Sequence, residues 1–272
     1  IDENIRGTDV FVVQPTCANG TVSVDQHLVE LMIMIDAFRR SSAARITAVL
    51  PYYGYARQDR KDQPRVPITA KLVAKLLEVA GTNRILTMDL HSTQIQGFFD
   101  IQADNLFAAP VILDYIKHMD HRNLMIVSPD IGSTKVGRAF AKRLDVDLAI
   151  VDKRRSEKDN VEVMNVIGDV KGRDVIILDD MITTGGTLVK AARAVQEKGA
   201  NSVVACATHA VFAGDACKLI MESPIREVVV TNTVPFNRFG ECPKVKMLDV
   251  SGLIAEAIKR IHYNESVSTL FV

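Results

Sequence analysis

Short apolar runs alternate along this chain with longer stretches whose apolar residues recur at helical spacing. Such alternation is typical of βαβ units, in which parallel strands are joined by helices. The predicted strands are Val10–Val13, Ile46–Leu50, Arg84–Met88, Leu124–Val127, Leu148–Val151, Val175–Leu178, Ser202–Ala207 and Glu227–Thr231. The predicted helices are His27–Arg40, Thr69–Ala80, Ala109–His118, Lys135–Leu144, Leu188–Lys198, Gly214–Met221 and Ile254–Ile261. The pattern therefore predicts an α/β fold with mainly parallel sheets flanked by helices.

Length and composition limit the classes of protein to which the chain can belong. Its 272 residues are enough for two domains of ordinary size, each with its own apolar core. The 33 basic and 33 acidic residues cancel, which argues against a nucleic-acid-binding surface. No apolar stretch approaches the ~20 residues that span a bilayer. The 4 cysteines form no C-x-x-C motif, as in reduced proteins. We therefore expect a soluble cytoplasmic protein with no nucleic-acid or membrane partner.

The segment after the predicted strand Val175–Leu178 carries the clearest chemical signal. Asp179 and Asp180 follow the strand, and a helix-period stretch then runs to Gly199, a residue type that commonly ends helices. The loop between them contains Thr183, Thr184, Gly185, Gly186 and Thr187. The N–H groups of such a loop and of a helix N-terminus can bind a phosphate. The carboxylates can accept hydrogen bonds from a sugar diol or bind Mg²⁺. The segment thus predicts a site for a phosphorylated sugar.

Two other interpretations of this segment stay open on the residues alone. An apolar strand ending in two acids also occurs in Walker-B motifs. The sequence has no G-x-x-x-x-G-K-[ST] motif, however, which argues against a P-loop NTPase. The second alternative is an ordinary connection from a strand to a helix, which would not need the acidic pair.

The loop closely resembles the ribose 5-phosphate loop of type I phosphoribosyltransferase-fold proteins, and the other motifs resemble those of ribose-phosphate pyrophosphokinases. In the order of that family, they are Tyr53–Lys61, Pro67–Lys71, Asp89–His91, Gln94–Asp100, Ser128–Asp130, Asp152–Arg155 and Glu265–Phe271. The resemblance begins at Asn4–Gly7 and continues to the C-terminus. It implies two tandem phosphoribosyltransferase-like domains.

The resemblance also implies where the domains divide. Residues 1–107 would form the N-terminal domain, residues 108–261 the C-terminal domain, and the tail 262–272 would return to the first domain. Members of the family ordinarily have a further strand–helix–strand stretch before the position of Asn4, so we expect this sequence to begin inside the first domain.

Three motifs contain residue types that suit a nucleoside triphosphate and its metal. An arginine such as Arg57 can bind phosphate oxygens in a bidentate manner, although the surrounding charged run could be an ordinary surface. His91 follows Asp89, and a neutral imidazole can bind or orient a metal, although a lone histidine is more often structural. The cations that begin at Lys153 could stabilise charge on phosphates or belong to a solvated loop.

The family resemblance assigns roles to these residues. The catalytic cations are Lys153 and Arg155, in a loop that closes over the reacting phosphates. The ATP contacts are Arg57, Gln58 and Asp62. The residues associated with Mg²⁺ are His91 and Asp130. The ribose 5-phosphate site consists of Asp179, Asp180, Thr183, Thr184, Gly185, Gly186 and Thr187. The implied reaction transfers the pyrophosphoryl group of MgATP to the 1-hydroxyl of ribose 5-phosphate. It gives AMP and phosphoribosyl pyrophosphate (PRPP) for nucleotide biosynthesis.

The resemblance further implies regulation and assembly. An anion site for a phosphate activator and an ADP inhibitor is matched by Arg6, Arg65, Gln96, Asp104, Asn105, Ser266, Ser268 and Phe271. In the family this site lies between subunits, and dimers assemble into a homohexamer, so we expect a homo-oligomer. A C-terminal segment that packs on its own domain would also explain the tail residues.

Three positions depart from the family pattern, and two other functions stay open. An acid usually stands at the position of Thr183 and a glycine at that of Ser133, and the segment Ala18–Val24 is longer than usual. One alternative function is that of a non-catalytic regulatory homologue, against which the presence of Lys153 and Arg155 argues. The other is a phosphoribosyltransferase that consumes PRPP, which normally lacks the motifs around Arg57 and His91.

Overall fold

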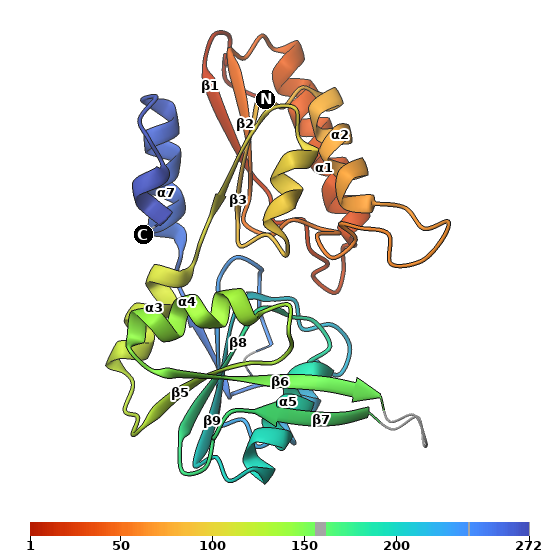
Figure 1. Cartoon of the computed structure of the whole chain (residues 1–272). Helices are drawn as coiled ribbons and strands as arrows, with labels where there is room; N and C mark the ends of the chain where they lie inside the picture. Colours follow the sequence, from red (N-terminus) through yellow and green to blue (C-terminus); the bar gives the residue numbers. More distant parts are fainter. Residues whose placement is uncertain (156–161, 239, 272) are drawn as a thin grey trace. The chain divides into compact units, whose positions relative to one another are not determined.

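The computed structural model describes residues 1–155, 162–238 and 240–271, and the chain divides into two compact units (Figure 1). The first unit contains Ile1–Ala108, Thr233–Pro235 and Val250–Val272. The second contains Ala109–Asn232 and Phe236–Asp249. The division thus differs from the predicted domain boundaries. The chain returns to the first unit at Val250 rather than at residue 262, so the last long helix belongs to the first unit.

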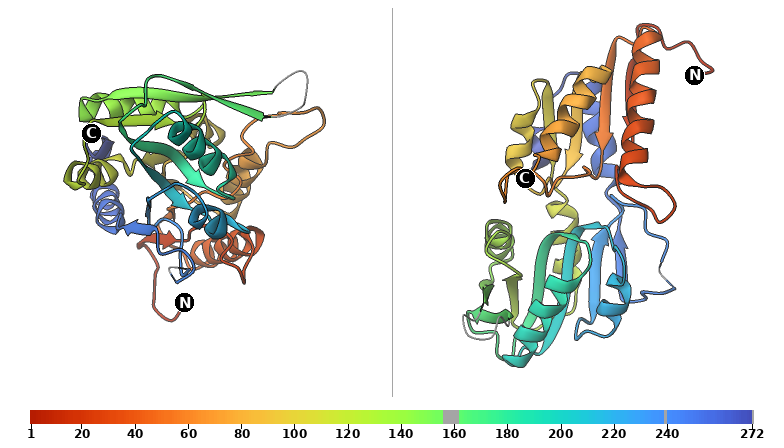
Figure 2. Two further views of the ribbon diagram at one scale, coloured as in Figure 1. Left: turned by 90° about the horizontal axis from the view of Figure 1, so that it is seen from below. Right: turned by 90° about the vertical axis from the view of Figure 1, so that its right-hand side faces the viewer.

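The first unit is a four-stranded parallel sheet in the order β1-β2-β3-β4. Its strands are β1 (Asp9–Val13), β2 (Arg45–Leu50), β3 (Arg84–Met88) and β4 (Gln102–Leu106). Its helices are α1 (Val24–Arg40), α2 (Thr69–Ala80), α7 (Ser251–His262) and the 3₁₀ turns η1 (Thr93–Phe98) and η2 (Ser268–Phe271). Helices α1 and α2 lie on one face of the sheet and α7 on the other, as Figures 1 and 2 show.

The second unit is a seven-stranded sheet in the order β11-β10-β9-β8-β5-β6-β7, and among its described strand pairs only β6–β7 is antiparallel. Its strands are β5 (Leu124–Ser128), β6 (Asp147–Arg155), β7 (Glu162–Ile167), β8 (Asp174–Ile182), β9 (Ser202–Ala210), β10 (Glu227–Thr231) and β11 (Val245–Leu248). Its helices are α3 (Ala109–His118), α4 (Thr134–Leu144), α5 (Gly186–Glu197) and α6 (Ala216–Met221). Helices α3 and α4 cover one face and α5 and α6 the other (Figure 2).

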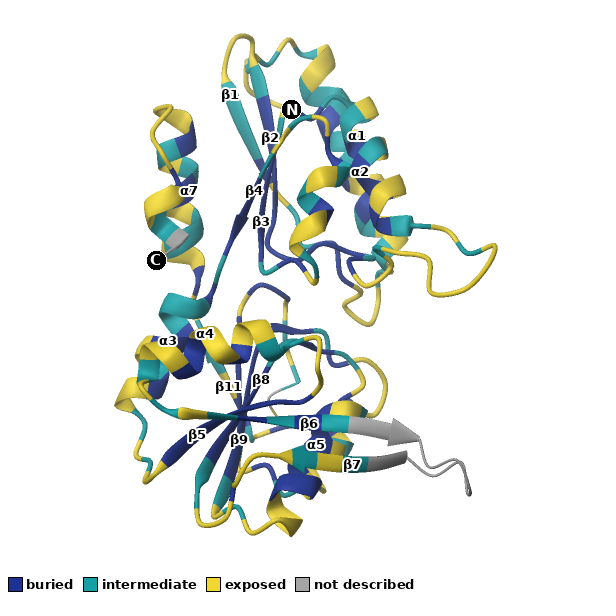
Figure 3. Ribbon diagram, in the orientation of Figure 1, coloured by how far each residue is buried: buried dark blue, intermediate teal, exposed yellow. Residues whose placement is uncertain are grey.

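The inner strands β2, β3, β8 and β9 are buried along most of their length (Figure 3). Such strands read as continuous apolar runs, which explains why the sequence identified them. All the predicted strands and helices are present, with ends that differ by a few residues. The α/β fold with mainly parallel sheets is confirmed.

Three strands were not predicted, and each has a physical reason. Strand β4 has the partly polar sequence QADNL, so it lacks an apolar run. Its polar residues Asp104 and Asn105 are nevertheless buried, and they bond to Arg84 of β3 and to the N–H of Leu90. Strand β7 returns antiparallel from β6, and β11 is a short edge strand with a lysine in it. The prediction of a loop that begins at Lys153 is wrong for the backbone, because β6 continues to Arg155.

An ion pair between β1 and β2 attaches the end of α7 to the first unit. The Arg45 guanidinium donates to both carboxylate oxygens of Asp9, and it also donates to the carbonyl of Ile261 (3.1 Å) and the side chain of Asn264 (3.1 Å). His262 contacts the same Asp9 carboxylate at 3.0 Å. The Arg45 guanidinium holds the pKa of Asp9 below its usual range. These contacts explain why α7 belongs to the first unit.

We predict that Arg45→Ala lowers the free energy of unfolding by about 1–3 kcal/mol, because it leaves the Asp9 carboxylate without its main partner. Urea denaturation monitored by circular dichroism measures this change. The control is Arg40→Ala on α1. Its ion pair with Asp36 is largely exposed, so the variant should cost at most ~0.5 kcal/mol. Equal losses in the two variants would contradict the structural role of Arg45.

Because the pKa of Asp9 is lowered in the folded protein, the stability that this carboxylate contributes is present above its unfolded pKa. It is lost as the pH falls through the folded-state pKa. The difference in stability between the wild type and Arg45→Ala should therefore shrink below the usual titration range of a carboxylate.

Candidate active site

The acidic pair lies within strand β8 rather than after it, because β8 continues to Ile182. Both Asp179 and Asp180 are half-buried between apolar residues of the strand. The N–H of Asp180 donates to the Asp179 carboxylate at 2.9 Å. Burial raises the pKa of Asp179 above its usual range, and the charges of Asp180 and Asp130 raise it further. The pair is thus a place where a cation or a hydrogen-bond donor is favoured.

The predicted phosphate loop connects β8 to the N-terminus of α5. Gly185 is the N-cap of the helix and has a left-handed backbone (φ +74°). In the described part of the chain no side chain caps this end of α5. The N–H groups of the first turn, which begins at Gly186, have no partners within a helix. They are therefore available to an anion, and Thr184 and Thr187 are exposed beside them.

The backbone of this loop is held by a neighbouring segment that sequence reasoning did not identify. The N–H of Phe212 donates to the carbonyl of Ile182 (3.0 Å), and the N–H of Ala213 donates to that of Thr183 (2.9 Å). Arg238 in turn donates to the carbonyl of Phe212 at 3.3 Å. In the structure, Phe212 (φ +44°) and Gly214 (φ +58°) both have positive φ values in this turn. The sequence signal that could have marked the turn is the isolated Gly214.

Asp130 lies in the turn between β5 and α4. Because β5 and β8 are adjacent and parallel, their carboxyl ends share one edge of the sheet. The Asp130 carboxylate accepts hydrogen bonds from the N–H (2.8 Å) and the hydroxyl (3.1 Å) of Ser133, the N-cap residue of α4. Asp130 is exposed, and its charge acts on the pKa of Asp179. The structure therefore brings Asp130 and the acidic pair into one electrostatic cluster in the second unit.

The predicted ATP contacts lie in the first unit, in the long connection between β2 and α2. Arg57, Gln58 and Asp62 are exposed. The N–H of Gln58 donates to the carbonyl of Tyr55 at 2.9 Å, and its carbonyl accepts from the N–H of Ala70 at 3.1 Å. The backbone of this turn is thus fixed while its long side chains reach solvent.

His91 follows strand β3, which lies beside β2 in the same sheet. The preceding Asp89 has a left-handed backbone (φ +40°), and its carboxylate accepts from the N–H of Ala108 at 2.9 Å. The neighbouring N–H of Leu90 donates to the side chain of Asn105 at 3.0 Å. His91 itself is exposed. This tight turn directs His91 to the same edge of the sheet as the turn that carries Arg57.

The predicted catalytic cations fall where the structure describes only the backbone. Lys153 and Arg155 are in β6, paired with Met164 and Glu162 of β7. Their side chains, like residues 156–161, lie outside the described part of the structure. Their catalytic role therefore stays a prediction, while their backbone lies on a strand of the second unit rather than in a loop.

The predicted regulatory residues all belong to the first unit. The contacts that the structure describes do not join them into one cluster. Asp104 is buried and forms an ion pair with Arg84 at 2.6 Å, while Asn105 holds the backbone of Leu90. The exposed or half-buried members of the set are Arg6, Arg65, Gln96, Ser266 and Ser268. The side chain of Phe271 lies outside the described part of the structure. Ser266 accepts from the N–H of Ser268 at 3.2 Å.

Two negative findings hold for the residues that the structure describes. None of their helices has the length and apolarity needed to cross a bilayer. Among them, no three or more histidine, cysteine or acidic side chains are grouped so as to hold a metal ion.

Comparison with known proteins agrees with this geometry. A model of the N-terminal domain of ribose phosphate pyrophosphokinase matches residues 1–81, and a model of the phosphoribosyl synthetase-associated domain matches residues 156–272. Ribose-phosphate pyrophosphokinases of Helicobacter pylori and Campylobacter jejuni are 55% and 54% identical to the whole chain, which covers 83% and 86% of their lengths.

The crystal structure of phosphoribosylpyrophosphate synthetase from Mycobacterium smegmatis is similar over nearly the entire chain. The TM-score is 0.90 at 44% identity, and the match covers 97% of this chain and 85% of the other. The order of the motifs, the two α/β units and these relatives lead to one conclusion: the chain belongs to the ribose-phosphate pyrophosphokinase family.

Proposed function

We propose that this protein transfers the pyrophosphoryl group of ATP to the 1-hydroxyl of ribose 5-phosphate and releases AMP and PRPP. The relatives named above are pyrophosphokinases or PRPP synthetases, and the likeness extends over the whole chain. The observation that carries the proposal is the partly buried acidic pair of β8 beside the uncapped N-terminus of α5. It offers a sugar-diol acceptor and an anion site within one strand–loop–helix unit.

The ribose 5-phosphate site follows from the residues of the second unit. The 5-phosphate binds the N–H groups at the start of α5, where the helix dipole favours negative charge. The hydroxyls of Thr184 and Thr187 add donors. Asp179 and Asp180 accept hydrogen bonds from the ribose hydroxyls, which relieves the cost of burying carboxylates. These contacts fix the ring and the direction of its 1-hydroxyl.

The reaction itself is a displacement at the β-phosphorus of ATP. A bond forms between the ribose 1-oxygen and that phosphorus, and the 1-hydroxyl loses its proton to solvent. The bond to the oxygen that bridges to the α-phosphorus breaks, and AMP leaves with this oxygen. Arg57 and Gln58 bind ATP, and Lys153 and Arg155 stabilise the negative charge on the pyrophosphoryl group in the transition state. Such catalysis depends on positioning and electrostatics, since the protein supplies no covalent chemistry.

We further propose that the divalent metal that this family generally needs is Mg²⁺ and that His91 and Asp130 are its protein contacts. An exposed imidazole and an exposed carboxylate that is oriented by Ser133 suit a hydrated Mg²⁺ with few protein ligands. When bound, the metal neutralises charge on the phosphates of ATP. Asp130 also adds to the negative field that acts on Asp179, so a cation beside it is electrostatically favoured.

Assay of AMP release tests the reaction directly. Release that depends on both ATP and ribose 5-phosphate, with PRPP as co-product, supports the proposal. Binding of both substrates without turnover would favour a non-catalytic regulatory homologue. Release of pyrophosphate from PRPP in the presence of a nucleobase would favour a phosphoribosyltransferase.

We predict that Lys153→Ala and Arg155→Ala each lower kcat by at least ~100-fold, the scale of losing one preorganised donor, while KM for both substrates changes little. Steady-state kinetics with both substrates varied measures the split. The control is Lys142→Ala, which removes an exposed cation in the last turn of α4. Near-normal kcat in both cation variants would exclude this catalytic role.

We predict that Gly185→Ala raises KM for ribose 5-phosphate by about 5-fold or more, with little change for ATP. A side chain at φ +74° costs roughly 1–2 kcal/mol, which favours loop conformations that turn the N–H groups away from the phosphate. Gly199→Ala is a matched control, because Gly199 at the other end of α5 also has positive φ (+91°). It should destabilise the protein without changing KM. A similar KM effect in both variants would contradict the assignment of the loop.

We also propose that the protein assembles into homo-oligomers and that phosphate activates it and ADP inhibits it, through a site that contains Arg65, Ser266 and Ser268. The two serines are exposed on the C-terminal segment next to η2, where they can reach an anion. Sedimentation with and without phosphate tests the assembly.

For regulation, we predict that Ser266→Ala combined with Ser268→Ala weakens phosphate activation and ADP inhibition together, because both anions lose the same hydroxyl donors. KM for ATP at saturating phosphate should stay nearly constant. Glu265→Gln, an exposed neighbour, serves as the control. Activation that survives the double substitution would show that the anion binds elsewhere.

A further inference from the structure

The turn that carries Arg57 and Gln58 contains a residue in an unfavourable backbone conformation. Tyr55 has a left-handed backbone with φ +63°. Residues other than glycine, asparagine and aspartate rarely adopt this backbone conformation. It persists at such a residue only where the surroundings hold it. Its carbonyl accepts the N–H of Gln58 at 2.9 Å, so the conformation of Tyr55 sets the path of the chain through Arg57 and Gln58.

One side chain from another element holds Tyr55. Its hydroxyl donates to the Asp25 carboxylate at 2.5 Å. This bond raises the pKa of the Tyr55 hydroxyl, as expected when the neutral phenol donates to a carboxylate. Asp25 lies in the first turn of α1, where the helix dipole favours a negative charge. The bond thus links the start of α1 to the ATP-binding turn.

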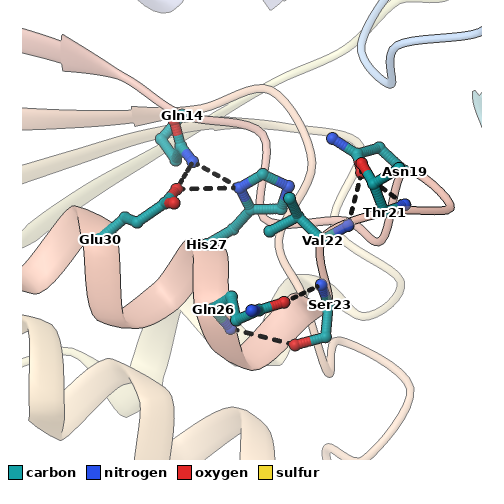
Figure 4. Close-up of polar contacts among 8 residues, drawn as sticks. All are labelled: Gln14, Asn19, Thr21, Val22, Ser23, Gln26, His27 and Glu30. Carbon is teal, nitrogen blue, oxygen red and sulfur yellow. Dashed lines mark hydrogen bonds and ion pairs between the residues drawn. The ribbon is translucent and has the colours of Figure 1, made fainter.

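The segment before α1 fixes Asp25 in turn. Figure 4 shows the Asn19 side chain against Thr21 and Val22, where its oxygen accepts both backbone N–H groups at 3.2 and 2.9 Å. It also shows Ser23 and Gln26 bonded reciprocally in a capping box at the start of α1. Apart from Gln26, these residues belong to the segment Ala18–Val24, which is longer than usual.

A second contact joins the same two segments. The N–H of Gly54 donates to the hydroxyl of Thr16 at 2.7 Å. A Cβ at Gly54 would lie 2.5 Å from the Thr16 carbonyl and 2.7 Å from the side chain of Val24. The turn Gly54–Gln58 is therefore packed directly against both ends of the segment 16–25. On its other side the carbonyl of Gln58 is tied to Ala70 at the start of α2.

We propose that Asp25 is a positioning residue for ATP: through the Tyr55 hydroxyl it holds the turn in the conformation that presents Arg57 and Gln58 to the triphosphate. The inference rests on the proposed function, in which these two residues bind ATP. It assigns a purpose to the long segment before α1, which would otherwise be a surface loop without a role. Asp25 acts through Tyr55 and need not touch the nucleotide.

Kinetics and equilibrium binding of four variants test this role. Asp25→Ala and Tyr55→Phe should each raise KM and the dissociation constant for ATP by about 3–10-fold, the scale of one exposed charged hydrogen bond. KM for ribose 5-phosphate should stay within about 2-fold in both, because its site lies in other elements. In the double variant, the dissociation constant for ATP should be at most about 2-fold higher than in either single variant, since both substitutions remove the same bond. Asp25→Asn keeps an oxygen acceptor and should recover most of the affinity.

The control is Asp36→Ala, which removes an exposed acid from the same helix. Loss of folded protein would lower kcat but not change KM, so destabilisation is separated from positioning. Any of four results would overturn the inference. Two are unchanged or tighter ATP binding in Asp25→Ala. The others are an equal rise in KM for ribose 5-phosphate and multiplicative effects in the double variant.

The equilibrium measurement also separates this inference from the proposed reaction. If the wild type binds ATP but releases no AMP, the proposed function fails. Weaker ATP binding by Asp25→Ala would then still support the positioning role, and unchanged binding would still overturn it.

Discussion

Burial of a carboxylate on an apolar strand is the constraint on which the sugar site depends. Strand β8 has neighbours on both sides, and its four residues directly before the acidic pair, Val175 to Leu178, are buried. Asp179 cannot lie there as a bare anion at low cost, and its pKa is raised accordingly. A ligand that brings hydroxyl donors or a cation removes this cost. In the proposed site the sugar hydroxyls would remove this cost, and the positive end of the helix that follows would favour the phosphate.

Three connections that follow strands each contain a residue with a left-handed backbone. Tyr55, Asp89 and Phe212 have positive φ values of 63°, 40° and 44°, and each lies in a connection that follows a strand. Residues in such conformations must be held by their surroundings. The holding contacts are seen in each case: a carboxylate for Tyr55, the N–H of Ala108 for Asp89, and the carbonyl of Ile182 for Phe212. These three turns are thus shaped by neighbouring elements of their own units rather than by their own propensities.

The difference between features set by local sequence and features set by distant contacts explains how much could be predicted from the sequence. Buried strands such as β2 and β8 contain mainly apolar runs, so their position and the parallel sheets were predictable. The acidic pair and its loop were predictable because the signal is local. Strand β4 was not, since Asp104 and Asn105 are stable there only through Arg84 and the backbone of Leu90. The pairing of Asp25 with Tyr55 and of Ala213 with Thr183 joins distant segments, and no local pattern announces such contacts.

The two substituted positions of the site have different physical consequences. Ser133 adds a hydroxyl that donates to Asp130 at 3.1 Å, beyond the backbone N–H that any residue there would offer. The extra bond orients the carboxylate. Thr183 holds the loop through its carbonyl, which accepts from Ala213 whatever its side chain is. An acid there would add a third negative charge near Asp179 and Asp180. The charge of Asp180 already raises the pKa of Asp179. The backbone bond holds the loop with either residue, and the neutral threonine limits the negative charge that the proposed sugar phosphate would approach.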